Sequence, residues 1–237
     1  MAVKACLNGG RTREEHAAVP QTAAELALDA VVCRRAGSFA VHVHPRDASG
    51  AETLGARACD AAVAAIRAAS PGLPVGLSTA EAIDPDPFAR AAAVARWRVP
   101  PDFVSVNVSE VGWAGIIRAA LHGGMGVEAG LSSRTAANEL ARSPFAHRVL
   151  RALIEVDAGV AEARAVAELV PSGLAQLWHG YEARTWEVVA AGAAAGHDVR
   201  IGLEDVTVLP DGRTATGNAE LVASAIDLIA RYSASDA

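Results

Sequence analysis

The sequence lacks the features that mark several protein classes. Its three cysteines, Cys6, Cys33 and Cys59, have neither a disulfide nor a metal-ligand spacing. An odd number of unpatterned thiols argues against a disulfide framework and predicts reduced cysteines in the cytoplasm. No apolar run is long enough to cross a bilayer, and no basic-then-apolar segment opens the chain. We therefore expect neither a membrane span nor a secretion signal.

Basic residues are also scarce. Lys4 is the only lysine, and 21 basic against 27 acidic residues give a formal net charge of −6. The chain has no basic stripe, so we expect no nucleic-acid partner. Aromatic residues make up only 4% of the chain, whereas 51% is hydrophobic and rich in alanine and valine. This composition suits short buried strands packed against alanine-rich helices, and the 237 residues suit one domain over 1–237.

A strand-then-helix alternation runs along the whole chain. Short apolar segments predict strands at 3–7, 38–41, 74–78, 103–108, 126–131, 149–156, 175–179 and 199–203. Helical patterns fill the intervals, and the last helix is expected over 218–232. Eight such repeats predict a (β/α)8 barrel. The alternative, an open doubly wound sheet, would require a glycine-rich phosphate loop after the first strand, and the segment 8–11 does not match that pattern.

Two histidines follow the second predicted strand in the segment His42-Val-His44-Pro-Arg46. Strand side chains alternate between faces, so His42 and His44 are expected to point to the same side. Two imidazoles in that arrangement are typical of a site for one divalent metal ion. The alternative is a pair of ordinary polar residues at the end of a strand.

A second motif, Arg200-Ile-Gly202-Leu-Glu204-Asp205, lies at the last predicted strand. Alternation would place Arg200, Gly202 and Glu204 on one face, with Gly202 leaving room at the barrel centre and Asp205 on the other face. In a closed barrel, a carboxylate at the end of the last strand could then reach a metal ion held by the second strand. Because Glu204 and Asp205 face different sides, one of them would bind the metal and the other would handle protons or orient Arg200. The alternative is a structural Arg–Glu pair inside the barrel.

Catalytic groups of such barrels lie at the C-terminal ends of the strands. Further candidates stand at those positions, namely Asn8, Arg11, Arg46, Ser78, Thr79, Asn107, Ser109, Glu110, Glu128, Glu155, Asp157, His179 and Glu182. For His179 the interpretation is an extra ligand or a supporting group, and the alternative is a loop histidine.

Taken together, the two motifs resemble those of the β-keto acid cleavage enzymes, also called 3-keto-5-aminohexanoate cleavage proteins. The resemblance extends in order to Asn8-Gly-Gly, Leu77-Ser-Thr, Gly126-Val-Glu128 and Gly217-Asn-Ala-Glu-Leu-Val. It implies a zinc-dependent barrel that condenses a β-keto acid with acetyl-CoA and splits the adduct into acetoacetate and a new CoA thioester. It also implies a homo-oligomer, either a dimer or a tetramer.

The resemblance further implies roles for individual residues. The zinc ligands would be His42, His44 and Glu204. Arg200 and Asp205 would form the catalytic pair, with Asp205 as general base; because it lies near cations, its pKa is expected to be lowered. Glu128 would be a second polar group near the metal. The residues expected to bind substrate are Ser78, Thr79, Asn107, Arg11 and Arg46.

Two positions depart from the family pattern. Arg11 stands where the family has a glutamate for an amino-bearing substrate. Together with Arg46 and Arg200 it predicts a preference for a keto acid with a second anionic group. Glu110 stands where a small hydroxyl residue is expected, without an evident reason. Alternative functions are a metal-dependent hydrolase, another zinc-dependent aldolase or lyase, or a metal-binding barrel without catalysis.

Overall fold

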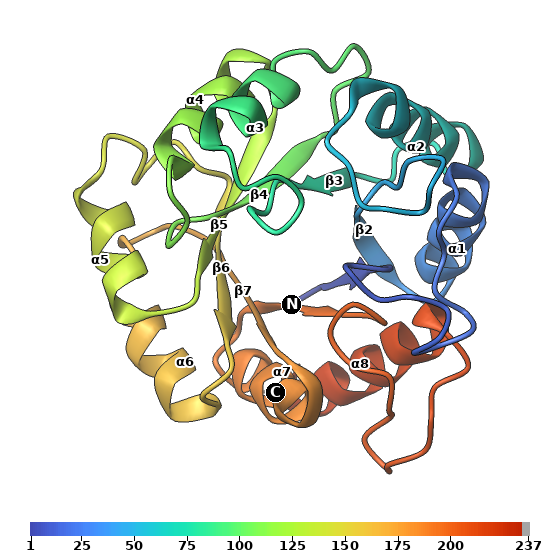
Figure 1. Ribbon diagram of the computed structural model, residues 1–237. Coiled ribbons are helices and arrows are strands. Elements are labelled where there is room, and N and C mark those ends of the chain that lie inside the picture. The colour runs from blue at the N-terminus through green and yellow to red at the C-terminus, as the bar shows by residue number, and fades with distance from the viewer. Residues whose placement is uncertain (234–237) are drawn as a thin grey trace.

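A closed barrel of parallel strands forms the centre of the computed structural model, which describes residues 1–233 (Figure 1). The strands pair in sequence order, and the last pairs with the first. The prediction of a (β/α)8 barrel is confirmed. The strands are β1 (Val3–Cys6), β2 (Ser38–Val43), β3 (Val75–Ser78), β4 (Phe103–Asn107), β5 (Gly126–Leu131), β6 (Arg151–Val156), β7 (Gln176–Gly180) and β8 (Asp198–Ile201).

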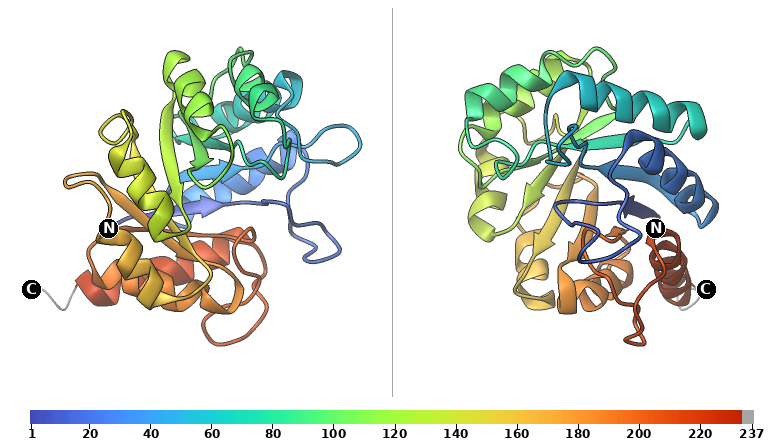
Figure 2. Two further views of the ribbon diagram at one scale, coloured as in Figure 1. Left: turned by 60° about the vertical axis from the view of Figure 1, so that its left-hand side comes forward. Right: turned by 45° about the vertical axis from the view of Figure 1, so that its right-hand side comes forward.

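Helices surround the barrel and cover its outer face (Figure 1). They are α1 (Ala23–Arg35), α2 (Ala56–Ala69), α3 (Pro87–Val94), α4 (Trp113–His122), α5 (Arg134–Arg142), α6 (Val160–Ala167), α7 (Thr185–Ala194) and α8 (Asn218–Ser233), with a 3-10 turn, η1 (Glu182–Arg184), before α7. Among the described residues, none of these helices combines the length and the hydropathy that crossing a membrane would require. The loops that follow β1 and β2 project from the same end of the barrel (Figure 2).

Side-chain caps explain where several helices begin. Thr22 and Glu25 form a reciprocal capping box at the start of α1, as their spacing predicts. Asp86 caps α3, and Pro87 follows it at the first helical position. Ser133 caps α5. These capping residues fix where the loop ends and the helix begins in α1, α3 and α5.

The seam between β8 and β1 is closed by tight backbone packing. A Cβ on Gly202 would overlap the carbonyl group of Cys6 and lie 2.9 Å from the Asn218 side chain. The glycine is therefore required by the approach of β8 to β1, and the expectation that it leaves room at the barrel centre was wrong. Asn218 donates to the carbonyl of Leu7 (2.8 Å) and accepts from the N–H of Leu203 (2.7 Å). One side chain thus joins the ends of β1 and β8.

The barrel interior contains a buried ion pair between Lys4 and Glu128. Arg151 adds a second cation 3.3 Å from Glu128, and the Lys4 ammonium lies 5.5 Å from the centre of the Phe103 ring. Glu128 lies two residues before Gly130 on β5, and Gly130 pairs with Asn107 at the end of β4. Its charge is balanced within the barrel. These contacts do not support the expected role of Glu128 as a polar group at the metal.

Candidate metal centre and active site

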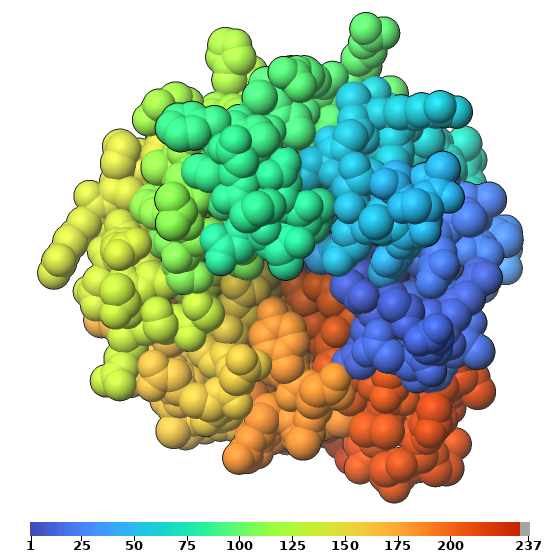
Figure 3. All heavy atoms as spheres, in the orientation of Figure 1, coloured from blue at the N-terminus to red at the C-terminus, as the bar shows by residue number. Residues whose placement is uncertain are grey.

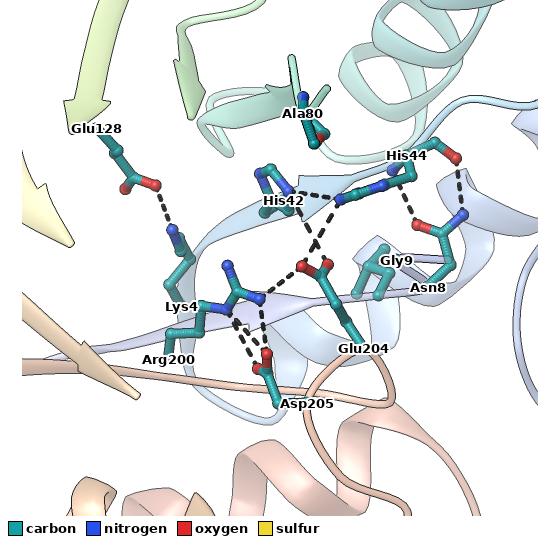
Figure 4. Close-up of polar contacts among 12 residues, drawn as sticks. Lys4, Asn8, Gly9, His42, His44, Ala80, Glu128, Arg200, Glu204 and Asp205 are labelled. Atoms are coloured by element: carbon teal, nitrogen blue, oxygen red, sulfur yellow. Dashed lines mark hydrogen bonds and ion pairs between the residues drawn. The ribbon is translucent and has the colours of Figure 1, made fainter. Parts of the chain in front are cut away.

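The two histidines of β2 and its following loop face each other at the mouth of the barrel (Figure 4). Their Nε2 atoms are 3.1 Å apart, and the rings are nearly perpendicular. His42 is 1% exposed and His44 is 8% exposed, so both rings are removed from solvent. The period-two alternation of a strand places both imidazoles on one side, as the sequence predicts.

Glu204 completes the group from the turn after β8. Its Oε1 is 3.6 Å from Nε2 of His44, and its Oε2 is 3.9 Å from Nε2 of His42. One ligand atom from each of the three residues lies within 4.8 Å of the others. Oε2 of Glu204 is buried and lacks a hydrogen-bond partner among the described residues. Two imidazole nitrogens and one carboxylate, gathered in this way, fit a divalent cation with positions left open.

Gly9 provides the space that Glu204 occupies. Its φ of +52° is in the left-handed region. A Cβ at this position would lie 3.1 Å from both Cβ and Cδ of Glu204, and closer still to Cγ. The residue after Asn8 is therefore small because the carboxylate passes over it.

His44 is held in place by two neighbours. Nδ1 of its ring contacts the carboxylate of Glu52, and the Asn8 side chain exchanges two hydrogen bonds with its backbone (2.8 and 2.9 Å). A carboxylate on Nδ1 orients the ring and leaves Nε2 directed toward the Glu204 carboxylate. Burial lowers the pKa of His44, but Glu204 and Glu52 outweigh it and raise the pKa to about 9. Glu52 was not among the predicted site residues, and its one signal in the sequence is its place eight residues after His44.

Arg200 holds both acidic residues of the second motif. Its Nη2 donates to Glu204 (2.5 Å) and to Oδ1 of Asp205 (2.6 Å), while its Nε lies 3.1 and 3.2 Å from the Asp205 oxygens (Figure 4). The prediction that Glu204 and Asp205 occupy opposite faces was wrong, because β8 ends at Ile201 and strand alternation does not extend to 204. Burial, opposed by Arg200, raises the pKa of Asp205 to about 6, whereas a lowered value was expected.

Across the mouth from the histidine pair lies a second polar group. A cavity of about 330 Å³ is lined by Asn107, Ser109, Ser132, Glu155, Asp157 and Tyr181. His179 lies beneath it, with Nε2 3.6 Å from Glu155 and Nδ1 3.5 Å from Asp205. Burial holds the pKa of His179 well below its usual value, so the ring is neutral. Neither ring nitrogen has a hydrogen-bond partner among the described residues, and the ring lies outside the set of metal-ligating atoms.

The polar residues after β3 differ in what they offer a ligand. The Ser78 hydroxyl accepts from the N–H of Ala80 (3.3 Å), and its own proton remains to be donated. The Thr79 hydroxyl donates to the carbonyl of Ser105 (2.7 Å) and is completely buried. Ser78 is therefore suited to a substrate carboxylate, and Thr79 is a structural residue. The expected substrate contact of Thr79 is not supported.

Neither loop arginine presents a free guanidinium. Arg11 pairs with Glu182 and, at 3.3 Å, with Glu15. Arg46 donates to three backbone carbonyls, those of Gly9, Gly50 and Arg11 itself, at 2.7 to 3.0 Å. The charge of Arg11 is balanced and Arg46 braces two loops. The expectation that they bind a second anionic group of the substrate is therefore not supported.

Glu110 has a structural explanation that its sequence position did not provide. It pairs with Arg90, which is completely buried on α3, and accepts from Nδ2 of Asn107 at 2.9 Å. Arg90 also donates to the carbonyls of Thr79 and Val111. A small hydroxyl residue at 110 would leave this buried cation without its counter-ion. The Arg90–Glu110 pair thus joins the loops after β3 and β4.

Seen from the loop end, the face is hollowed at its centre (Figure 3). Atoms from the last part of the barrel lie recessed there, between the blue loop after β1 and the green loop after β3. Catalytic groups of (β/α)8 barrels occupy this end. The ligand group and the polar cavity both lie at the C-terminal ends of strands, where this fold places its active sites.

Comparison with known proteins gives one family. A family model described as beta-keto acid cleavage enzyme matches residues 1–152 and 154–236. No curated protein matches the chain. Among solved structures the chain is similar to the apo structure of ObcA, with a TM-score of 0.69 and 17% identity over 88% of this chain.

Two further ObcA structures are similar. The binary complex of ObcA with oxaloacetate has a TM-score of 0.67 and 17% identity, and it covers 88% of this chain and 63% of ObcA. The ternary complex of ObcA with C4-CoA adduct and oxalate has a TM-score of 0.69 and 18% identity over 90% of this chain. At such identities the likeness shows the barrel fold alone. The chain spans between 61% and 64% of the ObcA chains that it matches.

Proposed function

The chain belongs to the beta-keto acid cleavage enzyme family, and from that membership we propose that it condenses a β-keto acid with acetyl-CoA and splits the adduct. The products would be acetoacetate and a new CoA thioester. The observation that carries this proposal is the joint presence of the His42–His44–Glu204 group and the Arg200–Asp205 pair at one barrel mouth. The oxaloacetate and CoA-adduct complexes of ObcA support both substrate classes.

The metal would be held by His42, His44 and Glu204. Zinc suits this donor set of two imidazoles and one carboxylate. When bound, a divalent cation supplies a Lewis acid that polarises a carbonyl oxygen and stabilises enolate charge. Glu52 supports this role because it orients the His44 ring, and Gly9 supports it because it leaves room for the Glu204 carboxylate.

Asp205 is the general base of the proposal. It would take a proton from C2, the carbon between the carboxylate and the ketone of the β-keto acid. Its pKa of about 6 leaves it ionised at neutral pH and close to the operating pH, where a base is most effective. Arg200 contacts both of its oxygens and holds the carboxylate in one orientation.

Ser78 and Asn107 complete the proposed substrate site. The Ser78 hydroxyl retains a proton for the carboxylate of the keto acid. Asn107 lines the cavity across the mouth, so its amide could contact the part of the adduct that extends away from the metal ligands. These two residues are the last of β3 and β4, the strands that follow β2 in the barrel order.

A product assay tests the proposal. The purified protein, loaded with zinc, is incubated with a panel of β-keto acids and acetyl-CoA, and products are identified by mass spectrometry. Acetoacetate together with a CoA thioester of the remaining fragment is the expected result. His44→Ala, which lacks a proposed ligand, is the negative control. Cleavage that proceeds equally without acetyl-CoA would indicate a hydrolase or lyase and overturn the proposed transfer.

A further inference from the structure

The cavity across from the metal centre contains a carboxyl group that the proposed function leaves unused. Glu155, near the end of β6, is 7% exposed and lines the cavity of about 330 Å³. In the described chain, His179 is the one basic side chain within ion-pair distance of it. Because His179 is neutral, no cation stabilises a negative charge on Glu155 at contact distance.

The backbone around Glu155 is shaped to admit its side chain. A Cβ on Gly130 of β5 would overlap Oε1 of Glu155 and lie 2.5 Å from Oδ1 of Asn107. The glycine lets both oxygens approach the same point above β5. A largely buried carboxyl group held beside an amide oxygen, with no cation at contact distance, favours its neutral, proton-donating form.

The surrounding charges act in both directions. The titratable or charged groups that face Glu155 are Lys4, Glu110, Asp157, His179, Tyr181, Arg200 and Glu204. Burial is the largest influence, and with Glu110 and Glu204 it outweighs Arg200 and Lys4, so the pKa of Glu155 rises to about 7. A substantial fraction of the protein therefore carries a proton on Glu155 at neutral pH.

We propose that Glu155 is a catalytic acid that delivers a proton to the substrate from the cavity side of the barrel mouth. The inference rests on the proposed function. The CoA thiolate, released when the acetyl group bonds to C2, adds to C3 of the adduct, and the bond between C2 and C3 then breaks with its electron pair left on C2. The carboxyl O–H of Glu155 gives its proton to C2, which forms a C–H bond and leaves Glu155 as a carboxylate. Water in the cavity then returns a proton to Glu155, and Asp205 releases to solvent the proton that it took from C2.

The position of His179 agrees with separate roles for Glu155 as the acid and Asp205 as the base. The ring separates Glu155 from Asp205, at 3.6 and 3.5 Å from the two carboxyl groups. The neutral imidazole keeps the proposed acid and base from direct contact, and neither of its ring nitrogens has a hydrogen-bond partner among the described residues.

Glu155→Gln tests the proposal with Glu168→Gln as the matched control. Glu168 lies at the end of α6, away from the cavity, so its substitution repeats the chemical change outside the site. The rate constant kcat of the wild type is expected to fall as the pH rises through about 7. Glu155→Gln should lose about 10²-fold in kcat and lose this descending limb, whereas the control keeps both. An active Glu155→Gln enzyme with the wild-type pH profile would overturn the role.

A spectroscopic measurement separates this role from the proposed function. The infrared difference between wild type and Glu155→Gln should contain the carbonyl stretch of a neutral carboxylic acid below pH 7, and the band should vanish as the pH rises through about 7. Absence of this band in the folded protein would overturn the proposal even if the enzyme is active. If the wild type cleaves no β-keto acid, the proposed function fails and this role fails with it.

Discussion

Replacement of Gly9 by alanine should damage the metal site without replacing any of its proposed ligands. The new Cβ would lie 3.1 Å from Cβ and Cδ of Glu204, whereas carbon atoms in contact are normally about 3.5–4.0 Å apart. Glu204 must therefore move by at least about 0.4 Å. Since metal–ligand distances tolerate only about 0.2 Å, its carboxylate leaves the position that faces His42 and His44. We expect zinc affinity to fall by roughly 10- to 100-fold, the range found when the support of a ligand is removed.

The backbone effect of the substitution needs its own control. Gly9 has a φ of +52°, so alanine there adds roughly 1–2 kcal/mol of left-handed strain. Gly212 has a φ of +85°, and a Cβ added to it would have nothing within 4 Å, so Gly212→Ala carries the strain without the collision. Both variants should lose stability on urea unfolding, Gly9→Ala more because of the added collision, and only Gly9→Ala should lose zinc affinity in competition with a chromogenic chelator. Equal zinc affinity in the two variants would refute the reasoning.

Three further substitutions distinguish residues needed for catalysis from residues needed for metal binding or for stability. Asp205→Asn should retain zinc and lose about 10²–10⁴-fold in kcat, because a base is lost and no ligand is; loss of zinc on metal analysis would contradict this assignment. Glu52→Gln should weaken zinc binding by about 10- to 100-fold, since the ring of His44 loses its carboxylate partner, and unchanged affinity in a chelator titration would exclude that support. Glu110→Ala should lower the free energy of unfolding by about 3–5 kcal/mol, because it leaves Arg90 buried without a counter-ion. Urea unfolding measures this loss, and a much smaller value would show that water or another group solvates Arg90.

The barrel and the histidine pair could be predicted from the sequence because both depend on regular repeats. The alternation of strands and helices indicates a parallel barrel, and the period of two along β2 still holds at His44, the first residue after the strand, so His42 and His44 lie on one side. The same rule failed at Glu204 and Asp205. There the strand ends at Ile201, and the turn that follows has no fixed period.

The partners of long side chains could not be predicted. The guanidinium of Arg11 pairs with Glu182, which lies 171 positions away, and the sequence alone does not show that these loops meet. The pairing of Arg90 with Glu110 could not be predicted for the same reason. Such pairs depend on how neighbouring loops fold over the barrel mouth, and local patterns contain no information on that packing. The raised pKa of Asp205 likewise follows from its burial, which only the fold reveals.

The seam joined by Asn218 has a consequence for how the protein folds. His42 and Glu204 are 162 positions apart. Bringing them together costs the conformational entropy of closing a long loop before any stabilising contact forms. The metal site therefore cannot assemble until the last strand pairs with the first. By mass action, an ion that binds only this closed form stabilises it by about 2.7 kcal/mol at a free concentration one hundred times its Kd. The concentration of the metal ion would thus govern how often the seam between β8 and β1 opens. Amide protons along that seam would exchange with solvent faster in metal-free protein than in metal-bound protein.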